Sequence, residues 1–328
     1  MAEPILRVEN LCCGFHTEDG YIRVVDGVSF DCEAGKTLGL VGESGCGKTV
    51  SALAVMGLLP QPAGVVEEGR ILFRGDDLAS TDRDRMRAVR GQQIGMIFQE
   101  PMTALNPVHR VGKQMFEAIG LYEPGLAKSE LTARAVDSLE QVGIPDPVRR
   151  LREYPHQLSG GMRQRVMIAM ALAGQPEILI ADEPTTALDV TVQAQILELL
   201  LELKESRGMT MIFITHDLGV VAEFCDEVLV MYAGRIAERA PVRPLFHTPR
   251  HPYTHGLIES LPRMDTPSRT PLNTIEGVVP KLNEMPPGCR FSNRCRHADE
   301  RCRREVPALE SCAPGHGVAC HHWHRLAA

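Results

Sequence analysis

The chain has 328 residues, of which 44% are hydrophobic and 23% are charged, and its formal net charge at pH 7 is −7. A chain of this length and apolar content can form one large domain or two smaller ones, with cores that need no disulfide or metal for stability. Its negative charge provides no bulk positive field for a phosphate backbone, so the composition argues against a nucleic-acid-binding protein.

The sequence predicts neither a membrane span nor a secretory leader. The longest uncharged apolar-rich run, Thr49 to Val66, is interrupted by Pro60 and Pro62, so its continuous apolar part is shorter than the ~20 residues that cross a bilayer. The first residues, MAEPILR, contain an early acid and lack the basic and apolar regions of a signal peptide. We therefore expect a cytosolic protein in which the ten cysteines stay unpaired.

The hydrophobic pattern indicates an α/β fold. Short apolar bursts between Ile5 and Val41, broken by Gly20 and by residues 33–35, predict strands. Further along the chain, strand-like runs alternate with helical spacing, which predicts a mostly parallel sheet covered by helices. The expected later strands are 94–98, 178–181, 211–214 and 228–231, and the clearest expected helix is 192–204.

Two segments differ from this alternating pattern. Helix formers dominate between Pro101 and Gln175, which predicts a helical insertion there. Residues 241–288 hold 10 of the 23 prolines, which predicts a separate, loop-rich tail. We therefore expect a first domain over 1–240, with a helical subdomain at about 101–175, and a C-terminal extension over 241–328.

A glycine-rich loop provides a candidate phosphate site between an apolar strand and a helical pattern. Its spacing, G-x-x-x-x-G-K-[ST], lets backbone N–H groups point at phosphate oxygens at a helix start. Lys48 would reach the β- and γ-phosphates, and Thr49 would bind Mg²⁺. A chance match to this pattern is expected in about one chain in a hundred of this length. The loop consists of Gly42, Glu43, Ser44, Gly45, Cys46, Gly47, Lys48 and Thr49.

Cys46 lies in this loop at a helix start, where a thiol pKa could fall. The alternative is that Cys46 is a filler without a chemical role.

Two adjacent acids follow the apolar strand 178–181. A phosphate loop needs a carboxylate for its metal and a base to orient water. Asp182 would meet Mg²⁺ through water, and Glu183 would face the attacking water. Taken alone, two acids after a strand are equally consistent with the start of a surface loop.

The segment Leu158-Ser159-Gly160-Gly161-Met162-Arg163-Gln164-Arg165 resembles the ATP-binding subunits of ABC transporters. The remaining motifs of that family follow in order as Gln99 (Q-loop), Ala187-Leu188-Asp189 (D-loop) and His216 (switch histidine). The resemblance implies a P-loop NTPase cassette with an N-terminal antiparallel β subdomain and a helical insertion.

The resemblance also implies roles for these residues. Glu183 and His216 would be catalytic, and Thr49, Gln99 and Asp182 would hold Mg²⁺. Two cassettes would face each other head to tail, so Ser159, Gly160 and Gly161 would act on the partner's ATP. Asp189 of the D-loop would be a further nucleotide-binding residue. Phe15 is the candidate that stacks on adenine, with Tyr21 as the alternative.

Other segments resemble the peptide-importing branch, which includes dipeptide permeases. These are the stretch from Gln99 to Pro107 and the run Arg250-His251-Pro252-Tyr253-Thr254. This resemblance implies a subunit peripheral to the cytoplasmic face of the bacterial inner membrane. Its implied partners are a second ATPase, in a heterodimer, two permeases, and through them an external peptide-binding protein. Dipeptide, oligopeptide, glutathione and nickel cargo stay open, and the alternative function is a soluble ABC-type ATPase in translation or repair.

Five of the ten cysteines lie in the last 40 residues. Their spacing matches neither zinc knuckles nor ferredoxin runs, so the chemistry alone suggests a soft metal or scattered free thiols. The tail resembles those of peptide-importer ATPases, some of which hold a [4Fe–4S] cluster. That resemblance assigns the cluster to Cys289, Cys295, Cys302 and Cys320, with zinc as the alternative. Cys312 departs from the pattern and either replaces one of these ligands or has no role.

Overall fold

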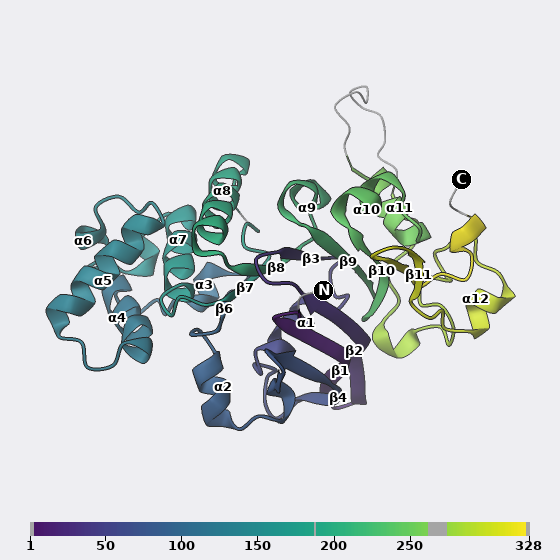
Figure 1. The fold of residues 1–328 in the computed structure, drawn as a ribbon, viewed down its shortest axis with the longest axis horizontal. Helices are drawn as coiled ribbons and strands as arrows, with labels where there is room; N and C mark the ends of the chain where they lie inside the picture. The colour runs from purple at the N-terminus through teal and green to yellow at the C-terminus, as the bar shows by residue number, and fades with distance from the viewer. Residues whose placement is uncertain (1–2, 187, 262–273, 326–328) are drawn as a thin grey trace. The chain divides into compact units, whose positions relative to one another are not determined.

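The computed structural model describes residues 3–186, 188–261 and 274–325, and it falls into two compact units. The terminal unit consists of Met1–Ser80 and Ile214–Ala328, and the middle unit consists of Thr81–Phe213. Both ends of the chain therefore belong to one unit (Figure 1).

The terminal unit begins with an antiparallel sheet in the order β2-β1-β4-β5. Leu6, Val8 and Leu11 of its central strand are at most 1% exposed, because they pack one face of the sheet into a core. This sheet confirms the expected N-terminal strands and the antiparallel β subdomain. Its strands are β1 (Leu6–Thr17), β2 (Gly20–Cys32), β4 (Gly64–Phe73) and β5 (Asp76–Asp77).

A second sheet of the terminal unit runs in the order β11-β12-β10-β9-β3. β3 pairs in parallel with β9, while β9, β10, β12 and β11 pair antiparallel in turn. Residues on both sides of position 240 share this sheet, since Glu238 of β10 pairs with Val318 of β12. The strands are β3 (Thr37–Val41), β9 (Glu227–Tyr232), β10 (Arg235–Pro241), β11 (Glu310–Ala313) and β12 (His316–Val318).

Helices complete the terminal unit, and most of them are short. The described residues after position 240 are rich in irregular structure, as the prolines of this segment predict. The helices are α1 (Lys48–Val55), α9 (Leu218–Phe224), α10 (Val242–His247), α11 (Pro252–Glu259) and α12 (Glu300–Arg304).

In the middle unit, β6 (Ile94–Ile97) pairs in parallel with β7 (Ile178–Asp182), and β8 (Thr210–Thr215) follows β7 in the strand order. Every residue of these three strands is buried, which is typical of a parallel sheet covered by helices.

The helices of the middle unit agree with the expected helical insertion. In α4, Val111, Met115 and Ile119 recur at intervals of four residues and are at most 3% exposed, so one face of the helix packs into a core. The helices are α2 (Arg83–Val89), α3 (Pro101–Ala104), α4 (Val111–Tyr122), α5 (Lys128–Gln141), α6 (Pro147–Arg150), α7 (Gly160–Ala171) and α8 (Val190–Arg207).

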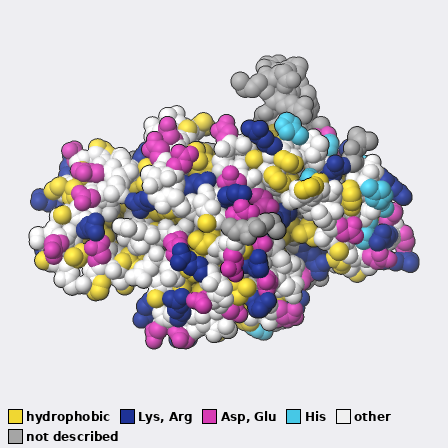
Figure 2. All heavy atoms as spheres, viewed as in Figure 1, with side chains coloured by type: hydrophobic (Ala, Val, Ile, Leu, Met, Phe, Trp, Pro, Cys, Tyr) yellow, Lys and Arg dark blue, Asp and Glu magenta, His cyan; other side chains and the backbone are white. Residues whose placement is uncertain are grey.

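Within the described part of the chain, no helix has both the length and the apolar character that a membrane span requires. The ten cysteines are all free thiols. Basic and acidic side chains intermix over the face seen in Figure 2, as a net charge of −7 on a globular chain would lead one to expect.

Candidate functional site

The glycine-rich loop lies between β3 and α1, the context that its sequence predicts. Gly42, Gly45 and Gly47 have φ values of 152°, 79° and 102°, a region that side chains with a Cβ rarely adopt. A Cβ on Gly42 would also lie 2.2 Å from the carbonyl oxygen of Met231. The loop therefore requires glycine for its conformation and for its close approach to β9.

Lys48 begins α1 and turns its ammonium group back over the loop. Its Nζ donates to the carbonyl oxygens of Gly42 at 2.7 Å and Glu43 at 3.2 Å, and the residue is only 5% exposed. The cation is thus placed beside backbone N–H groups at a helix start, an arrangement that favours a phosphate.

Cys46 is 1% exposed, and burial raises the pKa of its thiol. The possibility of a lowered thiol pKa at this position is therefore wrong, because burial outweighs the nearby Lys48 cation. Cys46 fills space in the loop, as the alternative interpretation holds.

The two acids of the middle unit lie at the carboxyl end of β7. Asp182 is the last residue of the strand and is 1% exposed. Glu183 follows with φ at 44°, a left-handed conformation that is uncommon and costly outside glycine. Such strain persists only where surrounding contacts hold it, and it clusters at functional sites.

Gln99 and Thr186 both donate hydrogen bonds to the Glu183 carboxylate. Gln99 donates from Nε2 to Oε2 of Glu183 at 3.1 Å, and Thr186 donates from Oγ1 to the same oxygen at 2.9 Å. Gln99 follows β6 and Glu183 follows β7, so the parallel pairing brings the two strand ends to one edge. The arrangement orients a carboxylate that can accept a proton or position water.

Ser159 caps the helix that begins with the two glycines. Its Oγ accepts from the N–H of Met162 at 3.3 Å, and Gly160 and Gly161 are the first residues of α7. A Cβ on Gly161 would lie 2.7 Å from Cγ1 of Val192, so the turn also needs glycine for packing. Ser159 and Gly160 are exposed at this helix start, which can donate N–H groups to an anion.

Asp189 caps the next helix, α8, by accepting from the N–H of Val192 at 3.0 Å. Asp189 is exposed. Of the predicted D-loop, Ala187 lies outside the described residues.

In the terminal unit, His216 is an exposed residue that directly follows β8. Phe15 and Tyr21, the two candidates for adenine stacking, lie in the β1–β2 hairpin and are half-buried. His16 pairs with Tyr21, and their rings lie 5.2 Å apart, so Phe15 points to the opposite face of the hairpin. A nucleotide could therefore stack on only one of the two rings.

Four of the five C-terminal cysteines line one small cavity. Burial raises the pKa of Cys289 to about 11 and that of Cys320 to about 12, with neighbouring thiols adding to both shifts. Cys312 lies on β11 instead, where its Sγ donates to the carbonyl oxygen of His316 at 3.3 Å. The cysteines at this cavity are Cys289, Cys295, Cys302 and Cys320.

A second possible ligand set overlaps this cavity. One ligand atom each from Asp299, Cys302 and His322 lies within 4.8 Å of the others. His322 Nε2 also lies 2.9 Å from Asp299 Oδ2, and Asp299 Oδ1 accepts from the N–H of Cys302 at 3.0 Å. The sequence reasoning missed the aspartate and the histidine, because their spacing to the cysteines follows no familiar pattern.

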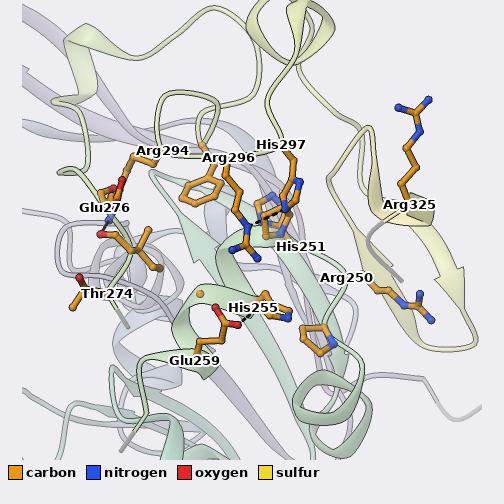
Figure 3. Close-up of a pocket in the computed structure, with 15 residues that line it drawn as sticks. Arg250, His251, His255, Glu259, Thr274, Glu276, Arg294, Arg296, His297 and Arg325 are labelled. Atoms are coloured by element: carbon orange, nitrogen blue, oxygen red, sulfur yellow. Dashed lines mark hydrogen bonds and ion pairs between the residues drawn. The ribbon is translucent and has the colours of Figure 1, made fainter. Parts of the chain in front are cut away.

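A larger cavity of ≈ 800 Å³ lies beside α11 (Figure 3). Arg296 points into it, near the pair of His255 and Glu259, whose Nδ1 and Oε1 atoms lie 3.3 Å apart. Arg294 lies on its wall next to Glu276 and donates from Nε to the carbonyl oxygen of Glu276 at 3.0 Å.

Comparison with known proteins places this geometry in a family. The family described as ABC transporter matches residues 25–186, and the family described as oligopeptide/dipeptide transporter, C-terminal region, matches residues 237–302. The dipeptide transport ATP-binding protein DppD of Escherichia coli is 49% identical over 318 residues, covering 97% of this chain and 96% of that protein.

DppD of Bacillus subtilis is 50% identical over 318 residues, covering 97% and 94% of the two chains. Among solved structures, a dimeric ATP-binding cassette, MJ0796, in a post-hydrolysis state with ADP and Pi, matches with a TM-score of 0.64 at 27% identity, covering 73% of this chain and 99% of that chain.

Proposed function

Because the chain belongs to the family of ATP-binding proteins of peptide ABC transporters, we propose that it hydrolyses ATP to power the import of di- or oligopeptides. The observation that carries the catalytic part is the Glu183 carboxylate, which Gln99 and Thr186 hold at the end of a buried strand, on a residue whose backbone has a left-handed φ. Relatives named for dipeptide transport, matching over nearly the full chain, support the cargo class.

For ATP binding, we propose that the loop from Gly42 to Thr49 holds the phosphates. The N–H groups of the loop would donate to phosphate oxygens, and the Lys48 ammonium would exchange its carbonyl partners for phosphate oxygens. Thr49 and Asp182 would provide oxygen ligands for Mg²⁺, a cation that is bound through few protein groups plus phosphates. When bound, Mg²⁺ would neutralise the negative charge that develops on the transferred phosphoryl group.

For hydrolysis, Glu183 would orient the attacking water and accept its proton. Gln99 would keep that carboxylate in place, besides its predicted role at the metal, and His216 would contact the γ-phosphate. This mechanism depends on positioning and electrostatics rather than on a covalent intermediate.

The Ser-Gly-Gly helix start would act on the ATP of a second cassette. Its exposed N–H groups and hydroxyl support this role, and the matching cassette structure is itself dimeric. We propose a heterodimer of two ATPase subunits on two permeases at the cytoplasmic face of the inner membrane, with an external binding protein delivering the peptide. An isolated chain should then hydrolyse ATP slowly.

For the tail, we propose a structural [4Fe–4S] cluster. The fit of the site rests on four cysteines at one cavity and on the separate position of Cys312. Such a cluster takes four thiolates, and it would supply a cross-link between the cysteine-bearing loops. The competing assignment is zinc on the set of Asp299, Cys302 and His322.

Metal analysis after anaerobic purification separates the two assignments. A cluster predicts about four irons and four labile sulfides per chain, lost in Cys289→Ser and kept in Cys312→Ser and in His322→Ala. Zinc that is kept in Cys289→Ser and lost in His322→Ala would overturn the cluster in favour of the smaller set.

The function itself is tested in a transporter assembled from this chain, two permeases and a second ATPase subunit. We expect Mg²⁺-dependent ATPase activity in membranes and uptake of labelled dipeptide or oligopeptide. Uptake of glutathione or nickel instead would correct the cargo. A purely soluble pool bound to ribosomes or DNA would contradict the importer.

A further inference from the structure

Glu43 of the phosphate loop forms an ion pair with an arginine from the C-terminal segment. Arg294 donates from Nη1 to Oε2 of Glu43 at 2.6 Å and from Nη2 to Oε1 at 3.0 Å. The Arg294 side chain is only 5% exposed, while that of Glu43 is 31% exposed. A two-pronged pair of this kind fixes the carboxylate in orientation as well as in position.

The backbone of Glu43 is held from two further directions. Its N–H donates to the hydroxyl oxygen of Tyr253 at 2.9 Å, and its carbonyl oxygen accepts from Lys48 at 3.2 Å. Tyr253 is fully buried, and its ring centroid lies 4.7 Å from that of Tyr232 and 5.4 Å from that of Phe291. Of the N–H, carbonyl and carboxylate groups of Glu43, the N–H and the carboxylate are therefore held by residues that follow position 240.

The arginine itself is anchored away from the loop. Its Nε donates to the carbonyl oxygen of Glu276 at 3.0 Å, and its Nη2 donates to that of Ile275 at 3.2 Å (Figure 3). Its guanidinium carbon lies 5.8 Å from the ring centroid of Tyr232. Arg294 therefore connects the backbone carbonyl groups of Ile275 and Glu276 to Glu43 of the phosphate loop.

We propose that Arg294 is a positioning residue for ATP, which holds the phosphate loop in its nucleotide-binding shape through Glu43. The inference rests on the proposed ATP-binding function and adds a residue of the C-terminal segment to it. The physical reason is preorganisation: a loop that is already ordered loses less conformational entropy when it binds phosphate. Without Arg294, the partly buried Glu43 carboxylate would lose its cation, and its negative charge would disfavour a bound polyphosphate.

The test measures the Kd of a fluorescent ATP analogue and the Tm of the full-length chain. Arg294→Ala should raise the Kd about tenfold, within the usual range for coupling between sites. Arg294→Lys, which keeps the charge and loses the two-pronged geometry, should restore part of the affinity. Tyr253→Phe removes only the hydroxyl acceptor and should raise the Kd by about threefold.

The matched control is Arg296→Ala, which removes the same charge two residues further on. Arg296 is exposed, donates to His297 Nε2 at 3.1 Å, and points into the cavity of Figure 3. The Kd of the Arg296→Ala variant for the fluorescent ATP analogue should equal that of the wild type.

A double-mutant cycle separates positioning from general destabilisation. The effects of Glu43→Gln and Arg294→Ala should not add, since both remove one ion pair. In the assembled transporter, Arg294→Ala should raise the KM for ATP more than it lowers kcat. Additive effects, a Kd unchanged in both Arg294→Ala and Arg294→Lys, or an equal loss in Arg296→Ala would overturn the proposal. Failure of the wild-type chain to bind Mg–ATP would instead overturn the proposed function.

Discussion

Two carboxylates, one in each compact unit, are held in different ways. In the middle unit, Glu183 is fixed by Gln99 and Thr186, which lie at the end of a neighbouring strand and three residues away. In the terminal unit, Glu43 is fixed by Tyr253 and Arg294, which lie 210 and 251 residues further along the chain. The proposed catalytic carboxylate thus depends on its own β-sheet edge, whereas the phosphate loop depends on a distant extension.

The largest expected effect concerns Glu183, the carboxylate that is held by residues close to it in the sheet. Glu183→Gln keeps the shape of the side chain and removes its basicity, so turnover in the assembled transporter should fall by about 10²–10⁴-fold. ATP binding should persist, and the closed dimer should accumulate because the bound nucleotide is not cleaved. Steady-state ATPase assays and size-exclusion chromatography with ATP measure both. Near-wild-type hydrolysis would remove Glu183 from its role.

How far the sequence could predict the site follows from this contrast. The loop from Gly42 to Thr49 and the acids after β7 are short motifs within regular elements, so spacing alone placed them on the correct strand ends and helix starts. Parallel strand ends meet at one edge, which also made a contact between Gln99 and Glu183 foreseeable.

The remaining features depend on backbone detail or on long-range packing. The left-handed φ of Glu183 has no sequence signal, because the residue is not glycine. Arg294 and Tyr253 lie in a proline-rich extension without hydrophobic periodicity, so nothing in the pattern indicated which side chains turn toward the loop. The run from Arg250 to Thr254 resembles a family feature in the sequence, but only the fold shows that Tyr253 contacts the phosphate loop.

A second prediction concerns the terminal unit, where another long-range ion pair with the C-terminal segment should contribute to the free energy of unfolding. Asp26 lies in the terminal unit between Arg23, Arg235 and Arg290, with the Arg235 pair at 2.7 Å. Burial alone would raise the pKa of Asp26, but hydrogen bonds and charge from these arginines lower it overall. Asp26→Asn should therefore cost about 2 kcal/mol at pH 7, below the value for a fully buried pair because Arg235 is partly exposed.

The sign of the pH dependence follows from the lowered pKa. Asp26 contributes stability that is complete above its unfolded pKa of about 4 and is lost as pH falls through its lower folded pKa. Urea unfolding from pH 7 to pH 3 should then show a smaller acid-dependent loss in Asp26→Asn than in the wild type. Asp31→Asn, at an ion pair of 2.9 Å that is more exposed, is the matched control and should change little. Parallel curves for wild type and Asp26→Asn would contradict the assignment.

The smallest expected effect probes how much support the Glu183 carboxylate needs. Thr186→Val removes the hydroxyl that donates to Glu183 and keeps the side-chain shape, so this hydrogen bond is lost. Because Gln99 still holds the same oxygen, kcat should fall only about five- to tenfold, which corresponds to about 1 kcal/mol, the net contribution of a typical hydrogen bond. Thr185→Val, one residue earlier, is the control and should match the wild type. If Thr186→Val lowered kcat as far as Glu183→Gln does, the carboxylate would depend on the hydroxyl itself, and Gln99 could not be its second support.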